Sequence, residues 1–218
     1  MNVSGLKSLT ILKSHCPEIQ LGQKICRVVN EEFPHYSITK FKPLISRHIA
    51  KTSNPAAIHK ISGIMYSNRP QMYINGAQYL SDLFPFVEKY KSFNCYESAN
   101  LSELALKING VKNSYTANLY KGDANVDHVV CLFNRDGSPF NGEIKNNQTI
   151  IIDAWAGVCD FANKLFKEYE GYWAEFLKIP SWHADAAKQK FELRDISDLS
   201  LKDKFLEFIL ERYPNLKL

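Results

Sequence analysis

The sequence of 218 residues predicts an α+β fold, in which a central helix packs on a small antiparallel β-sheet after an N-terminal helical part. Residues 18–92 carry apolar side chains at helical spacing, and residues 114–153 contain three runs rich in β-branched and aromatic residues. Turn-forming segments join these runs, which favours antiparallel pairing. We expect a single domain over 1–218, with 1–92 forming one wall and 93–218 forming the core.

The first part of the chain is predicted to be helical. Glu18–Phe33 has apolar residues at roughly helical spacing, and Pro34 ends the pattern. Further helices are expected at Ile38–Ala50, at Pro55–Tyr66 and at Pro70–Tyr90. Pro85 should kink or split the last of these helices, because proline removes a backbone donor and clashes with the preceding turn.

From Asn94 onward the pattern changes to mixed helix and strand. A helix is predicted over Tyr96–Ile108, and Asn109-Gly110 supplies its stop. The expected strands are Ser114–Tyr120, His128–Phe133 and Thr149–Asp153. The remaining predicted elements are a helix at Asp160–Tyr172, a strand at Phe191–Ile196 and an amphipathic helix at Ser200–Tyr213.

The cysteines are scattered and none belongs to a CxxC pair, which argues against a disulfide framework and a zinc knuckle. They stand at Cys16, Cys26, Cys95, Cys131 and Cys159. The sequence contains no run of about 18 apolar residues, so no membrane-spanning helix is expected. The N-terminus lacks the pattern of a cleaved secretory signal. We therefore expect a soluble protein of a reducing compartment, with secretion into a host cytosol without a cleaved signal as the open alternative.

Positive charge gathers in the front of the chain. Residues 1–94 carry 12 Lys and Arg against 5 Asp and Glu, whereas residues 95–218 carry 15 against 18. A basic segment attracts acidic partners, and the alternative is an ordinary solvated helix surface. The candidate docking residues are Lys40, Lys42, Arg47 and Lys51. Nucleic acid is not expected, because the aromatic residues do not interleave with a basic run.

Three residues far apart in the sequence suggest one chemistry. Cys95 falls where a loop ends and a helix begins, and the partial positive charge there favours a thiolate. His128 opens an apolar strand directly after a turn, and Asp153 closes another apolar strand. If the two strands lie side by side, the carboxylate orients the imidazole and the ring faces the thiol. This is the nucleophile, base and orienting acid of cysteine and serine hydrolases.

Each of these three residues, and Trp155 two positions after Asp153, also has a structural interpretation. Cys95 fits a small buried apolar residue, His128 a histidine at a strand end, Asp153 the cap of a turn, and Trp155 a core residue. Cys26 and Cys131 are predicted to be core, since each lies in an apolar pattern, whereas Cys159 is close enough in sequence to approach the site. His183, with Asp185 near it, competes with His128 for the role of base. No histidine pair has the spacing of metal ligands on one face, so no metal or cofactor is expected.

The motifs around these three residues resemble the papain-like cysteine hydrolases. They are Asn94-Cys95, His128-Val129 and Ile152-Asp153-Ala154-Trp155-Ala156-Gly157. They are closest to the branch that includes bacterial effector proteases of the YopT type and the glutamine deamidase domains of bacterial toxins and effectors. The resemblance covers about residues 93–158. Phe93 and Tyr96 depart from it, since they stand beside Asn94-Cys95 where glycines are expected.

The resemblance implies a papain-like fold and a hydrolase that cleaves an amide bond of a protein substrate. Glutamine deamidation and proteolysis are the favoured outcomes, and acyl transfer to an amine is the third. The resemblance also implies an upstream amide side chain as oxyanion donor, for which Asn94, Gln78 and Asn75 are the candidates, and places Trp155 near the substrate. The alternative outside enzymology is a helical adaptor protein with a coincidental or decayed triad.

Overall fold

The computed structural model of the chain describes residues 16–33, 85, 95–122, 124–176, 190–199 and 203–218. These residues form an α+β structure with four α-helices and a five-stranded antiparallel sheet, which confirms the predicted class. The helices expected over 38–50 and 55–66, and all but Pro85 of the one expected over 70–90, lie outside the described residues.

The sheet has the strand order β4-β3-β2-β1-β5, and every pair of neighbours is antiparallel. Its strands are β1 (Ser114–Lys121), β2 (Ala124–Asn134), β3 (Thr149–Asp153), β4 (Val158–Phe161) and β5 (Phe191–Ser197). The strands predicted at residues 114–120, 149–153 and 191–196 are therefore present at nearly the expected bounds.

Two predicted boundaries were wrong. β2 begins at Ala124 rather than at His128, because β1 and β2 form a tight hairpin in which Lys121 pairs with Ala124. His128 consequently lies inside a strand. Residues 158–161 form the edge strand β4, although residue 160 was expected to open a helix. The turn after Asp153, in which Gly157 takes a φ of 73°, returns the chain to pair with β3.

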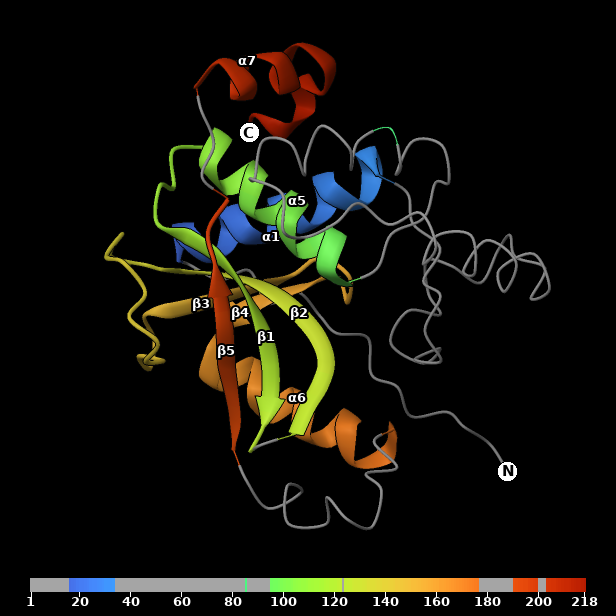
Figure 1. Cartoon of the computed structure of the whole chain (residues 1–218), viewed down its shortest axis with the longest axis vertical. Coiled ribbons are helices and arrows are strands. Elements are labelled where there is room, and N and C mark those ends of the chain that lie inside the picture. Colours follow the sequence, from blue (N-terminus) through green and yellow to red (C-terminus); the bar gives the residue numbers. More distant parts are fainter. Residues whose placement is uncertain (1–15, 34–84, 86–94, 123, 177–189, 200–202) are drawn as a thin grey trace, which may run out of the picture.

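The described helices cover both faces of the sheet (Figure 1). They are α1 (Pro17–Glu32), α5 (Cys95–Ile108), α6 (Ala162–Phe176) and α7 (Asp203–Arg212), and a short 3-10 helix follows at Pro214–Leu216. Side chains of β2 and β3 alternate between two cores. Cys131, Phe133 and Ile152 pack with α1 and α5, whereas Leu132 and Ile151 pack with α6.

Helix α1 approaches β3 and β4 closely at a glycine. A Cβ added at Gly22 would collide with the Cys159 sulfur and would lie 3.2 Å from Cγ1 of Ile152. Any larger residue at this position would push the helix away from the sheet. Cys159 is held in the core by this contact, and its thiol points toward the Ile19 carbonyl oxygen at 3.8 Å.

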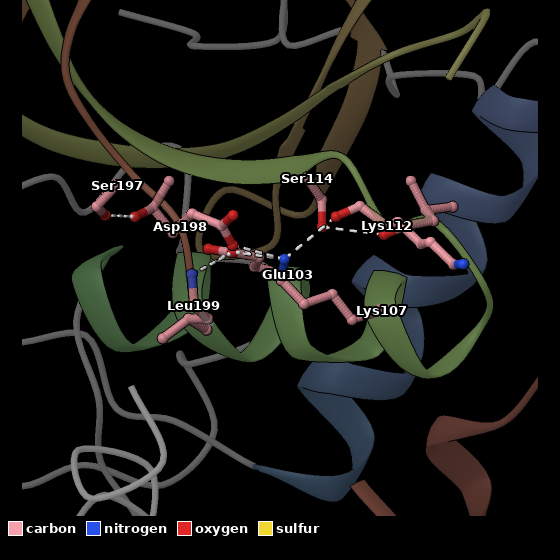
Figure 2. A network of polar contacts seen from close by, with 9 residues as sticks. Glu103, Lys107, Lys112, Ser114, Ser197, Asp198 and Leu199 are labelled. Atoms are coloured by element: carbon pink, nitrogen blue, oxygen red, sulfur yellow. Dashed lines mark hydrogen bonds and ion pairs between the residues drawn. The ribbon is translucent and has the colours of Figure 1, made fainter. Parts of the chain in front are cut away.

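A buried carboxyl group joins α5 to the segment after β5 (Figure 2). Glu103, whose side chain is inaccessible to solvent, accepts the Leu199 N–H at 2.7 Å on Oε1 and lies 3.4 Å from the Lys107 ammonium. Lys107 also bonds Asp198 at 2.7 Å. Burial raises the pKa of Glu103 to about 8, against the lowering effects of the Leu199 N–H and Lys107. This side chain ties the end of β5 to the middle of α5.

We expect Glu103→Gln to flatten the pH dependence of the free energy of unfolding between pH 4.5 and about 8. A carboxyl group with a raised folded-state pKa contributes stability that is present below its unfolded pKa and lost as the pH rises through the folded value. Glutamine keeps an oxygen for the Leu199 N–H but does not ionise. Urea unfolding should show that the free energy of unfolding of the wild type falls by a few kcal/mol more between pH 5 and pH 8 than that of the variant. A pKa shift of this size predicts a loss of that order.

Asp198→Asn is the control for this experiment, since Asp198 bonds the same lysine at an exposed position. It should leave most of the pH dependence in place. Equal losses of stability in the wild type and in Glu103→Gln would contradict the assignment of this titration to Glu103.

None of the helices in the described part of the chain combines the length and the apolar character that a membrane span requires.

Candidate active site

Three elements bring the predicted triad together at one end of the β2–β3 ladder. Cys95 is the first residue of α5, His128 lies in β2 and Asp153 is the last residue of β3. The last pair of the ladder is Cys131 with Ile152. Beyond this pair, β3 is still paired with β4, while β2 is still paired with β1. The two strands thus part at His128 and Asp153, and their side chains meet there.

The imidazole and the carboxylate form a buried hydrogen-bonded ion pair. The Nε2 atom of His128 lies 2.7 Å from Oδ2 of Asp153, and both side chains are nearly inaccessible to solvent. Oδ1 of Asp153 accepts the backbone N–H of Ala156 at 3.0 Å, which folds the turn after β3 around the carboxylate. Asp153 therefore caps its turn, as its structural interpretation expected, and it also binds the imidazole.

The thiol completes the set. The Cys95 side chain hydrogen-bonds His128. Since Nε2 is bonded to Asp153, Nδ1 is the ring nitrogen left to face the sulfur. Cys95 is 7% exposed, and it packs with Trp155 in a small cluster separate from the two cores, with Val129 and Ala156 beside it. A cysteine in this position does not fill either core.

The electrostatics favour the charged forms of the imidazole and the carboxylate. Burial, the largest influence, lowers the pKa of His128, but the charge and hydrogen bond of Asp153 and the contact with Cys95 outweigh it and raise the pKa to about 10. Burial likewise raises the pKa of Asp153, yet His128, Tyr169 and the Ala156 N–H together hold it below its usual value. The site therefore holds an imidazolium beside the thiol at neutral pH.

Trp155 packs against both His128 and Cys95. Its ring centroid lies 5.2 Å from that of His128, and its side chain contacts Cys95. Trp155 is almost wholly buried, but it belongs to the small cluster rather than to the main cores. Its expected place near the substrate stays a prediction.

Several sequence candidates lie outside the described residues. They are the oxyanion candidates Asn94, Gln78 and Asn75, the competing base His183 with Asp185, and the basic docking residues Lys40, Lys42, Arg47 and Lys51. The backbone donors at the start of α5 are described. Cys95 is the first residue of α5, so its backbone N–H lies at the N-terminus of that helix.

The other buried cysteines are core residues. Cys26 and Cys131 lie in the main core, as predicted, and burial raises the pKa of both thiols well above the ordinary value. Cys159, which is close enough in sequence to approach the site, lies in the same core against α1. None of the five cysteines, all of which are described, forms a disulfide bond. Of the five thiols, Cys95 is the one whose contact with an imidazole the structure shows.

Two residues of the site were missed from sequence. Tyr169 of α6 donates its hydroxyl to Oδ2 of Asp153 at 2.7 Å. Asn30 of α1 donates to the Ala154 carbonyl at 2.9 Å and so anchors the turn that carries Trp155. No local pattern distinguishes these two residues, because each acts across more than ten residues of sequence.

Within the described residues, no group of three or more His, Cys, Asp and Glu side chains is placed to hold a metal ion. In comparisons with known proteins, no family model, no curated protein and no solved structure matches the chain.

Proposed function

We propose that the protein is a cysteine hydrolase that acts on an amide bond of a protein substrate through Cys95, His128 and Asp153. The observation that carries the proposal is the convergence of the three side chains, with His128 bonded to the carboxylate on Nε2 and to the thiol on its other side. A buried imidazolium held beside a thiol stabilises the thiolate that such an enzyme needs.

The arrangement also supports the papain-like resemblance. The nucleophile opens a helix that packs on the sheet, the base lies on one strand, and the acid ends the neighbouring strand. A tryptophan packs against the base, and the sheet is antiparallel. These features agree in kind with a papain-like architecture, in which the cysteine and the histidine come from opposite sides of the site.

The chemistry follows in two steps. The Cys95 thiolate attacks the amide carbon, and backbone N–H groups at the start of α5 bind the oxyanion. His128 gives its proton to the leaving nitrogen as the C–N bond breaks, which leaves a thioester. His128 then takes a proton from water, the hydroxide attacks the thioester, and the C–S bond breaks to release the carboxylic acid and the Cys95 thiolate beside the imidazolium. Asp153 keeps the ring oriented throughout.

The same steps serve glutamine deamidation and peptide cleavage, which differ in the leaving nitrogen. Side-chain deamidation releases ammonia, whereas proteolysis releases a new N-terminus. The motifs of residues 93–158 favour an effector-type enzyme that acts on a folded protein. Attack by an amine instead of water on the thioester gives acyl transfer with the same residues.

Mass spectrometry of proteins incubated with the wild type tests this function. In a cell lysate, we expect either new N-termini or glutamine sites whose mass rises by ~1 Da, as hydrolysis of a side-chain amide requires. Cys95→Ala should lower the rate of these modifications by at least about 1,000-fold, since it removes the nucleophile. Identical peptide sets from the wild type and from folded Cys95→Ala would contradict the proposal.

A further inference from the structure

The carboxylate of Asp153 is held by a third element besides β2 and its own turn. Oδ2 of Asp153 accepts two donors, Nε2 of His128 and the hydroxyl of Tyr169, each at 2.7 Å. Tyr169 belongs to α6, which begins directly after β4. Helix α6, which follows the Asp153 turn and β4, thus supplies a second hydrogen-bond donor to the Asp153 oxygen that bonds His128.

The Tyr169 ring is itself fixed by apolar neighbours. It is almost wholly buried in the α6 core, with ring centroids 6.5 Å from Phe166 and 6.1 Å from Phe191. The Tyr169 and His128 rings also stand nearly perpendicular to each other, with centroids 6.2 Å apart. A side chain packed in this way holds its hydroxyl in one place, so the hydrogen bond to Asp153 has little freedom to shift.

We propose that Tyr169 is a positioning residue of the site, which fixes the Asp153 carboxylate in its ionised form and in the orientation that aims His128 at Cys95. This inference rests on the proposed function. In this role Tyr169 acts through Asp153 rather than on the thiol or the substrate itself.

The physical reason is the cost of a buried charge. A carboxylate removed from water needs donors for its lone pairs, and a hydroxyl that donates to the ionised form favours that form. Burial and the neighbouring Asp153 raise the pKa of Tyr169 well above its usual value, so the phenol stays a neutral donor. With the carboxylate ionised, the imidazolium next to Cys95 is stabilised in turn.

A double-mutant cycle tests whether Tyr169 acts through Asp153. Tyr169→Phe, Asp153→Asn and the double variant are labelled with iodoacetamide, and the rate at Cys95 is measured relative to the half-exposed Cys16. Tyr169→Phe alone should lower the Cys95 rate by about 10-fold, as expected for the loss of a hydrogen bond to a charged group. In the Asp153→Asn background it should cause almost no further loss. Additive losses would overturn the inference.

The pH profile separates positioning from a merely structural role. Loss of the hydroxyl donor should raise the pKa of Asp153. As the pH is lowered, the rate of Cys95 labelling should therefore begin to fall at a higher pH in Tyr169→Phe than in the wild type. This fall is the acid limb of the profile. Tyr120→Phe is the matched control. Tyr120 also donates its hydroxyl to a carboxylate, that of the exposed Asp195 at 2.9 Å, but this bond joins β1 to β5. The control should leave the acid limb unchanged. An unmoved limb in Tyr169→Phe would overturn the inference even if the melting temperature falls.

A titration that does not use reactivity distinguishes the two proposals. The ¹³C carboxyl signal of Asp153 should titrate at a higher pH in Tyr169→Phe than in the wild type. If it does so while Cys95 labels no faster than Cys16 in the wild type, the proposed function fails and the hold of Tyr169 on Asp153 stands. If the signal titrates at the same pH in both proteins, the role of Tyr169 is wrong whatever the reactivity of Cys95.

Discussion

Replacing His128 with alanine is expected to slow the alkylation of Cys95 at neutral pH by at least about 100-fold, the lower range for loss of a general base. In the wild type the imidazolium contacts the thiol, and a positive charge beside a thiol in general favours the thiolate. Without the ring, Cys95 keeps only the field of the helix N-terminus and lies among apolar neighbours. The rates at the other four cysteines should stay unchanged. Time-resolved labelling with iodoacetamide and peptide mapping measures all five rates in one experiment.

His128→Gln is the matched variant for this measurement. Its amide donates to the Asp153 carboxylate, so the buried charge keeps a partner, but it does not take up a proton. Both variants should lose the reactivity of Cys95, while His128→Gln keeps more of the stability. Full reactivity of Cys95 in folded His128→Gln would show that the thiol does not depend on the imidazole.

Replacing Asp153 with alanine is expected to lower the free energy of unfolding by about 3–5 kcal/mol, as for other buried pairs that lose one partner. The carboxylate accepts hydrogen bonds from His128, Tyr169 and the backbone of Ala156. Alanine leaves these three donors without an acceptor inside the protein. Asp153→Asn keeps an oxygen in place and should cost about half as much. Urea unfolding at pH 6 measures both values.

The exposed Asp136 provides the control for this measurement. Its carboxylate accepts the Ser138 N–H in a surface turn, so Asp136→Ala should change the stability little. A loss of stability in Asp153→Ala no larger than that in Asp136→Ala would contradict the buried network.

The stability difference between the wild type and Asp153→Asn should also depend on pH. The raised pKa of His128 contributes stability that is present below pH 6.5 and lost as the pH rises to about 10. The lowered pKa of Asp153 contributes stability that is present above 3.8 and lost as the pH falls through the folded value. The stability difference should therefore be largest between pH 3.8 and pH 6.5, where both contributions are present.

The sequence was sufficient to predict four of the five strands, and to single out Cys95, His128 and Asp153, for a local reason. Runs of β-branched and aromatic residues predict strands, and a polar residue at the end of an apolar run indicates a place where a strand leaves the core. Asp153 ends β3, and the strand was predicted at its observed bounds. Cys95 was expected at the start of a helix and is the first residue of α5.

The remaining features depend on contacts that sequence patterns do not encode. β4 has four residues and forms because the turn at Gly157 returns the chain to β3, so its own composition gave no signal. Likewise, His128 lies inside β2 because hairpin pairing extends that strand through turn-forming residues. Tyr169 shows the same limit, since one aromatic residue on an amphipathic helix has no mark of its hydrogen bond to Asp153.

The order in which the cysteines of the wild type react with iodoacetamide tests the account most directly. Exposure alone predicts that the half-exposed Cys16 reacts before Cys95, which is 7% exposed. Activation by His128 predicts the opposite order, with Cys95 labelled first and selectively at pH 6 to 7. Labelling of Cys16 ahead of Cys95 in the folded protein would contradict the claim that the thiol, the imidazole and the carboxylate form one reactive site.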